Sequence, residues 1–288
     1  MEILNSSKHM IWNAPTSHVG PVEVRRPMPM GHTRSVGPFV LLDHFGPVPA
    51  PSGKLPAHPH AGIEVMTYLM DGANEHTDSL GNIGQIGPGG AQWMKSGRGI
   101  LHTERNLVDR ASTMHGLQIW ARLPIEQQDD APDYRAFQAE EMTHWTRDCA
   151  DIKLIAGDLE WRQGPLPLAS PSVMAHITLD RNSRTDFQLW SADHEYALYV
   201  IESVEGVWVD DTDRVPAGAM LRVAPHRTTL RLSNKSSRSA DVFLLGGAPA
   251  PQPLVFGGSY VLDSEAAIQA ADQRYRLGEM GTLDGVPF

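Results

Sequence analysis

The apolar residues of this chain gather in short runs that alternate with turn-forming residues. Runs of this kind occupy residues 39–42, 65–69, 197–201 and 242–245. Glycine and proline, with 26 and 22 copies in 288 residues, separate the runs at short intervals. Many short apolar runs bounded by such breakers predict the strands of a sandwich or barrel. The pattern therefore predicts an all-β fold class.

Helical periodicity is clear only near the C-terminus. Ser264 can cap a segment that carries Ile268, Ala271 and Tyr275 on one face, and Gly278 can end it. We therefore expect only short helices, one of them at about 264–277.

A weak internal repeat predicts two domains. Residues 88–91 (Pro-Gly-Gly-Ala) are echoed by residues 216–219 (Pro-Ala-Gly-Ala), and an apolar run ending in Gly72 or Gly206 precedes each copy. Two copies of one β-fold explain this better than a single large sheet. The polar segment 127–133 separates the copies, so we expect one domain at 1–130 and another at 131–288.

Charge and cysteine content narrow the class of protein. The formal net charge of −10 disfavours direct binding of DNA or RNA, whose phosphates it would repel. No run of about 18 apolar residues predicts a membrane-spanning helix, and the N-terminus lacks a secretory signal. The single cysteine, Cys149, fits a reducing compartment. These features predict a cytoplasmic protein.

Two short motifs carry the candidate chemistry. His58-Pro59-His60 lies about forty residues before His102-Thr103-Glu104. Residues two apart on a strand point to the same face, so each motif projects two potential ligands together. The alternative is a solvated surface cluster, but burial of unpaired imidazoles and carboxylates would be costly, and a bound cation offsets that cost. We therefore predict a metal site made of His58, His60, His102 and Glu104.

The types of ligand narrow the choice of metal. Nitrogen and oxygen donors without a nearby thiolate exclude an iron–sulfur cluster and a cysteine-based zinc site. Three imidazoles and one carboxylate leave two octahedral positions for water, substrate or dioxygen. Fe(II) is the favoured occupant, with Mn, Ni, Cu and Zn as alternatives. Glu64 shares the parity of the histidines and is either an alternative ligand or a group that orients an imidazole.

The second copy lacks a complete set of ligands. Counting from the turn glycines, Ala192 and His194 take the places of His58 and His60, and Leu230 takes that of His102. We expect the second domain to be a scaffold, although His194 and His226 leave an alternative site open.

Four residues are candidates for a substrate pocket. Met66 and Tyr68 share the parity of the histidines, Trp93 follows a Pro-Gly-Gly turn, and His44 can approach the entrance. Packing in the core explains Met66 and Tyr68 at least as well, and Trp93 has no clear preference. For His44, a place in a turn is the better explanation.

At this point the chain resembles a known family. The matching segments are 42–47, 58–60, 68–72, 76–82, 97–104, 244–249 and 275–278. On these residues the chain is identified as a member of the pirin family in the cupin superfamily. The resemblance implies two tandem cupin barrels (double-stranded β-helix or jelly roll), of which only the first binds metal. It also implies that His58, His60, His102 and Glu104 are the ligands, whereas the broader cupin pattern would use Glu64.

The family implies two kinds of function. Some bacterial members are quercetin 2,3-dioxygenases, and animal members act as iron-dependent cofactors of transcription regulators. The leading hypothesis is a dioxygenase that cleaves flavonols such as quercetin with O₂, with Glu104 as general base towards a small aromatic substrate. The alternative is a non-enzymatic, redox-sensing iron protein that modulates a protein partner. A cupin isomerase or hydrolase, active without oxygen, is a third possibility.

Overall fold

The chain forms two compact units, each assembled from discontinuous segments. The computed structural model describes residues 8–20, 22–109 and 111–283. Unit 1 contains the described residues up to Pro15, Arg25–Phe39 and Met142–Pro249. Unit 2 contains Thr16–Val24, Val40–Glu141 and the described residues from Ala250 onward.

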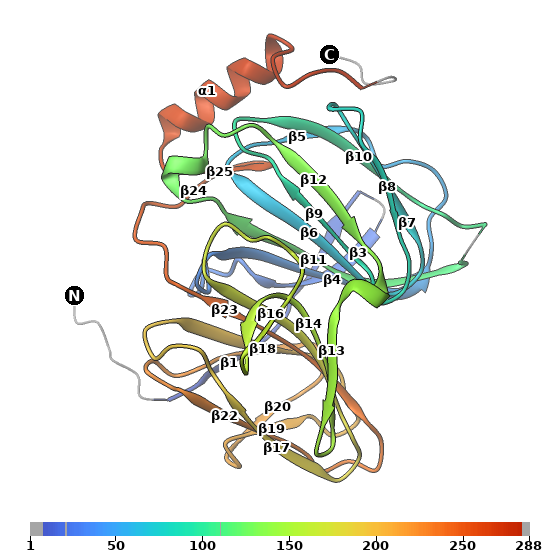
Figure 1. Cartoon of the computed structure of the whole chain (residues 1–288), viewed down its shortest axis with the longest axis vertical. Helices are drawn as coiled ribbons and strands as arrows, with labels where there is room; N and C mark the ends of the chain where they lie inside the picture. The colour runs from blue at the N-terminus through green and yellow to red at the C-terminus, as the bar shows by residue number, and fades with distance from the viewer. Residues whose placement is uncertain (1–7, 21, 110, 284–288) are drawn as a thin grey trace. The chain divides into compact units, whose positions relative to one another are not determined.

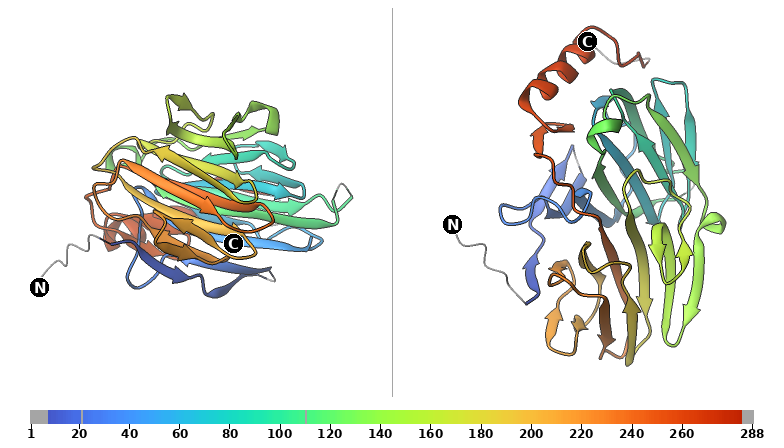
Figure 2. Two further views of the ribbon diagram at one scale, coloured as in Figure 1. Left: turned by 90° about the horizontal axis from the view of Figure 1, so that it is seen from below. Right: turned by 60° about the vertical axis from the view of Figure 1, so that its left-hand side comes forward.

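Unit 2 is built from two sheets that lie face to face (Figure 2). The larger sheet has the order β12 (Asp133–Phe137), β9 (Ala91–Lys95), β6 (Ile63–Asp71), β11 (Thr113–Arg122), β4 (Phe39–Pro49), β3 (Val22–Met28) and β2 (Thr16–Val19). Of β3, the residues up to Val24 belong to unit 2. The smaller sheet has the order β5 (His58–His60), β10 (Ile100–Asn106), β7 (Asn74–Asp78) and β8 (Ile83–Ile86). Two 3-10 turns, Ile125–Gln127 and Ala139–Glu141, flank β12.

Unit 1 repeats this arrangement (Figure 1). Its larger sheet has the order β1 (Met10–Asn13), β21 (Ala219–Arg222), β18 (Glu195–Glu202), β23 (Ala240–Gly247), β16 (Ser172–Leu179), β14 (Ala150–Leu159) and β13 (Thr143–Arg147), with β15 (Arg162–Gln163) paired to β14. Its smaller sheet has the order β17 (Ser183–Gln188), β22 (Thr229–Asn234), β19 (Val207–Val209) and β20 (Asp213–Val215).

The internal repeat of the sequence is visible in the order of the strands. The order β9-β6-β11-β4 in unit 2 corresponds to β21-β18-β23-β16 in unit 1, and β5-β10-β7-β8 corresponds to β17-β22-β19-β20. Gly89 and Gly218 both have positive φ, at 80° and 75°, in the turns before β9 and β21. The all-β prediction is confirmed, and the glycine turns that suggested the repeat lie at equivalent places.

The chain is grouped differently from a division at residue 130. The polar segment 127–133 lies within unit 2, because β12 pairs with β9. At the other end, the chain leaves unit 1 after Pro249 and joins unit 2. There the hairpin of β24 (Val255–Gly257) and β25 (Tyr260–Leu262) meets the β5–β6 turn through a bridge between Ala61 and Tyr260. The described residues from Ala250 onward therefore complete the unit that carries the histidines.

The predicted C-terminal helix is present as α1 (Glu265–Arg276; Figure 1). The Ser264 hydroxyl caps it by accepting a hydrogen bond from the Ala267 amide at 3.2 Å. Ile268, Ala271 and Tyr275 form the face that packs on unit 2, as their spacing predicted. Within the described residues, no helix is long and apolar enough to span a bilayer.

Candidate metal centre

Three predicted ligands come together at one place in unit 2. Strands β5 and β10 are antiparallel neighbours, and their register sets His58 directly opposite His102. The Nε2 atoms of these two histidines are 3.1 Å apart. Each of His58, His60 and His102 offers a ring nitrogen within 4.8 Å of the other two, a spacing that suits a shared metal ion.

Backbone carbonyls orient two of the three imidazoles. The Nδ1 of His58 lies 3.0 Å from the Pro56 oxygen, and the Nδ1 of His60 lies 2.9 Å from the Ser259 oxygen. A carbonyl only accepts, so in both rings the proton belongs on Nδ1. The Nε2 lone pair of each neutral ring is therefore available to a metal.

Burial keeps the inner histidines neutral. Desolvation, together with the neighbouring His58 imidazole, lowers the pKa of His60 to about 3. Burial lowers the pKa of His102 well below its ordinary value, and the His60 and His58 rings lower it further. Metal ligation requires neutral imidazole. The donors present thus fit a metal ion at neutral pH.

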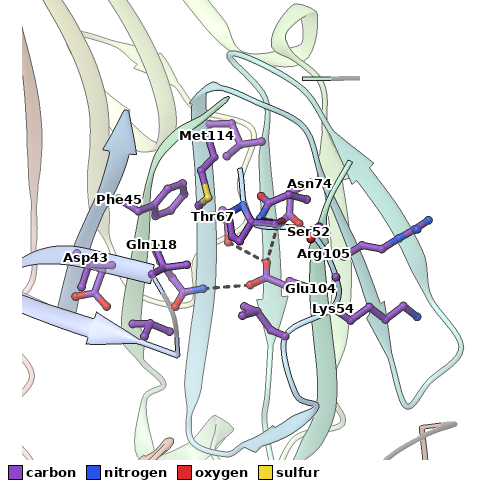
Figure 3. Close-up of a pocket in the computed structure, with 18 of the residues that line it drawn as sticks. Asp43, Phe45, Ser52, Lys54, Thr67, Asn74, Glu104, Arg105, Met114 and Gln118 are labelled. Carbon is purple, nitrogen blue, oxygen red and sulfur yellow. Dashed lines mark hydrogen bonds between the residues drawn. The ribbon is translucent and has the colours of Figure 1, made fainter. Parts of the chain in front are cut away.

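Glu104 lies beside the histidines, although its carboxylate is not within the 4.8 Å group. Glu104 lies two residues after His102 on β10, so the two side chains share one face of the strand. Its Oε1 accepts hydrogen bonds from Thr67 at 3.3 Å, from Asn74 at 3.1 Å and from Gln92, while Gln118 approaches Oε2 at 3.4 Å (Figure 3). Four donors from four strands hold this carboxylate. Its role as a ligand stays a prediction.

A cavity of about 150 Å³ opens on the Glu104 carboxylate. Figure 3 shows Glu104 reaching in from β10, with Gln118 to the left of its carboxylate and Thr67 and Asn74 above it. The apolar lining includes Val24, Phe45, Leu69 and Met114. The segment from Pro51 to Pro56 and the residues Asp43, Arg105 and Asn106 also line it. A buried anion thus meets an apolar space.

Glu64, Met66, Tyr68 and Trp93 do not line this cavity. Thr67 of β6 faces Glu104, so the even-numbered residues of the strand point to its other face. On that face the Trp93 indole donates to Glu64 at 2.8 Å. The physical reason is Gly62, whose φ of +77° breaks the alternation between β5 and β6. A prediction that counts alternate residues from His60 through Gly62 therefore assigns each side chain of β6 to the wrong face of the strand.

His44, predicted at the entrance, is also outside the cavity lining. Its neighbours along β4, Asp43 and Phe45, line the cavity instead. The Nε2 of His44 lies 2.8 Å from the Nε2 of His115. His44 is therefore a buried partner of another histidine.

Comparison with known families now decides the ancestry of the chain. Residues 21–121 match the family model of pirin, and residues 174–281 match that of the pirin C-terminal cupin domain. The chain belongs to the pirin family. Its two units are thus tandem cupin folds, as the resemblance in sequence implied.

One curated relative and two solved structures illustrate what the chain is similar to. The chain is 33% identical over 273 residues to a Pseudomonas aeruginosa protein named provisionally as a quercetin 2,3-dioxygenase, covering 93% of this chain and 84% of the relative. A crystal structure of quercetin 2,3-dioxygenase from Acinetobacter baumannii superposes with a TM-score of 0.88 at 24% identity, covering 95% of this chain and 97% of the other. A bacterial pirin from Escherichia coli in complex with nickel(II) superposes with a TM-score of 0.64 at 18% identity, covering 84% and 100%.

The C-terminal cupin of this pirin has an apolar interior where the first has histidines. On β17 and β22, which correspond to β5 and β10, Phe187 faces Leu230 in the core. Ala192 and His194 follow β17 rather than lying in it, and His226 is exposed in a turn. Within residues 8–20, 22–109 and 111–283 there is no second group of three metal-binding side chains.

The sequence did not reveal the polar residues around Glu104. These are Thr67, Asn74, Gln92 and Gln118, together with Tyr134, whose hydroxyl donates to Gln92 Oε1 at 3.3 Å. A usable signal existed in β9, where a buried glutamine interrupts an apolar strand. Such an amide needs a partner inside the fold.

Proposed function

We propose that this member of the pirin family is a metal-dependent dioxygenase acting on flavonols such as quercetin. The observation that supports the proposal is the convergence of three imidazoles beside a carboxylate that opens on a largely apolar cavity. Relatives named as quercetin 2,3-dioxygenases support an oxidoreductase rather than a purely structural protein.

His58, His60, His102 and Glu104 would hold the ion, with Fe(II) as the favoured occupant. Nitrogen and carboxylate donors suit Fe(II), Mn, Ni, Cu and Zn, so occupancy depends on supply as well as affinity. The nickel complex of the Escherichia coli relative fits that range. When bound, the ion supplies a Lewis-acidic, redox-active centre at which an ionised hydroxyl and O₂ can meet.

The side chains of the cavity have separate tasks. Glu104 accepts the proton of the substrate hydroxyl, and the donors around it hold the carboxylate in place before the proton arrives. Phe45, Leu69 and Met114 exclude water from the ring. A cavity of about 150 Å³ is of the size that holds one benzene ring. One ring of a flavonol therefore lies inside, and the others extend towards the segment 51–56.

The test is anaerobic titration of Fe(II)-loaded protein with quercetin, followed by admission of air. The proposal expects a perturbed flavonol spectrum without oxygen, then O₂ uptake and loss of the flavonol band. Binding without turnover would contradict it and favour the redox-sensing alternative. Turnover under anaerobic conditions would instead favour an isomerase or hydrolase.

A further inference from the structure

The third imidazole is oriented differently from the other two. His58 and His60 each direct Nδ1 at a backbone carbonyl. The Nδ1 of His102 instead faces the Nδ1 of His76 on β7, at 3.4 Å. His102 can donate its Nδ1 proton to His76 there only if the ring proton of His76 is on Nε2.

The surroundings of His76 meet that condition. Its Nε2 lies 3.2 Å from Oδ2 of Asp78, and both side chains are buried. The Asp78 carboxylate also accepts the amides of Leu80 and Asn82 on Oδ1 and the Asn82 side chain on Oδ2. Burial alone would raise the pKa of Asp78. The hydrogen bonds that the carboxylate accepts have the larger combined effect, so the net pKa lies below the ordinary value. The carboxylate is thus an acceptor for the Nε2 proton.

We propose that His76 and Asp78 are positioning residues that set the tautomer of His102. Asp78 holds the proton of His76 on Nε2, His76 Nδ1 accepts the proton of His102 Nδ1, and His102 Nε2 is left with a lone pair towards the ion. The inference rests on the metal site of the proposed function. It adds two residues that would not touch the ion.

Tyr134 connects this pair to the carboxylate side of the centre. Its ring stacks on His76 with centroids 4.0 Å apart and planes 3° from parallel. Its hydroxyl donates to Gln92, whose amide donates to Glu104. A Cβ on Gly84 would lie 2.1 Å from the Tyr134 hydroxyl, so glycine there leaves room for the ring. One aromatic residue therefore supports both the His102 and the Glu104 sides of the site.

Asp78→Asn tests the tautomer with almost no change of shape. An amide nitrogen placed at Oδ2 donates to His76 Nε2, which moves the ring proton to Nδ1 and sets two donors against each other. Loss of such an outer partner typically costs 10- to 100-fold in metal affinity. We expect a loss of roughly that size for Ni(II) and Zn(II), measured by competition with a chelator. The melting temperature of the metal-free protein separates this effect from misfolding.

His76→Phe is the second variant, because it keeps a ring against Tyr134 but removes the acceptor. Its matched control is His176→Phe, since His176 pairs with Asp241 at the same 3.2 Å but lies on β16 in unit 1. We expect His76→Phe to weaken metal binding and His176→Phe to leave it unchanged. If wild type, Asp78→Asn and His76→Phe bind the metal with equal affinity, the inference about His76 and Asp78 is overturned, but the metal site of the proposed function is not. A wild type that binds no ion would overturn the metal site as well.

Nitrogen-15 NMR of the wild-type protein loaded with Zn(II) gives a readout that does not depend on any variant. We expect the proton of His76 on Nε2 and that of His102 on Nδ1. A proton on Nδ1 of His76 would refute the proposed chain of hydrogen bonds.

Discussion

The Nε2 atoms of His58 and His102 face each other at 3.1 Å across neighbouring strands. The Pro56 carbonyl accepts the Nδ1 proton of His58, so in this tautomer the Nε2 lone pair of His58 points at His102. If His102 also carries its proton on Nδ1, two lone pairs meet in a partly buried place. A cation between them turns this repulsion into two bonds, so the site is arranged for an occupant rather than for the metal-free state.

Metal binding is therefore expected to stabilise the protein. A ligand that binds only the folded state contributes about 2.7 kcal/mol when its free concentration is 100 times the Kd. For Ni(II) or Zn(II) we expect the melting temperature to rise by several degrees. Calorimetry measures this rise. His58→Ala should abolish the rise, and His176→Phe should keep it. An equal rise in His58→Ala would mean that the ion binds elsewhere.

The histidines also predict how the stability of the metal-free protein depends on pH. The pKa of His60 falls from 6.5 to about 3 on folding, so between these values the unfolded chain binds a proton that the folded chain does not. The free energy of unfolding should therefore fall as the pH drops below 6.5, by up to ~1.4 kcal/mol per pH unit from this group. The lowered pKa of His102 acts in the same direction.

The measurement is urea unfolding of metal-free wild type and His60→Gln between pH 7.5 and 4.5. His60→Gln should lose less stability over that range, because it lacks one of the groups that the unfolded state protonates. Parallel pH profiles of the two proteins would contradict the pKa assigned to His60.

Strand periodicity was sufficient to predict the three imidazoles, because each pair lies within one strand. His58 and His60 are two apart on β5, and His102 and Glu104 are two apart on β10. To bring the two pairs together, the fold had only to pair β5 with β10. The glycine turns of the repeat were also readable, since a positive φ restricts the choice of residue.

Parity failed where the backbone leaves the strand conformation. Gly62, between β5 and β6, reverses which face the following residues occupy, so Thr67 rather than Met66 or Tyr68 faces Glu104. The Ser259 carbonyl that orients His60 comes from almost 200 residues further along the chain. No local pattern encodes a contact of that sequence separation. It depends on how the C-terminal segment packs.

The two candidate carboxylates are expected to behave differently. Glu104→Gln removes the proton acceptor and sets an amide against the donors Asn74 and Gln92. Positioned acid–base groups typically contribute 10²- to 10⁴-fold. We expect kcat for quercetin to fall by roughly that factor. Glu64→Gln is the matched control, because Glu64 bonds Trp93 on the other face of β6. It should retain metal content and activity, and loss of metal in this variant alone would assign the ligand to Glu64.

Gly62 is expected to be intolerant of a side chain. Its φ is +77°, and a Cβ would lie 2.3 Å from the Val261 carbonyl oxygen and 2.5 Å from Leu262 Cδ2. Gly62→Ala should therefore cost more than the ~1–2 kcal/mol of a left-handed alanine, because β25 must also move. The Ser259 carbonyl moves with that hairpin, so metal affinity should fall too.

Gly20→Ala separates the two causes. Gly20 also has positive φ, at +57°, but among the described residues no atom outside its two chain neighbours lies within 4 Å of its Cβ position. It therefore carries the cost of the left-handed backbone without the collision. We expect a small loss of stability and unchanged metal affinity, measured by urea unfolding and chelator competition. If the two variants lose equal stability and both keep wild-type affinity, the contact between Gly62 and the β25 backbone does not hold the His60 carbonyl in place.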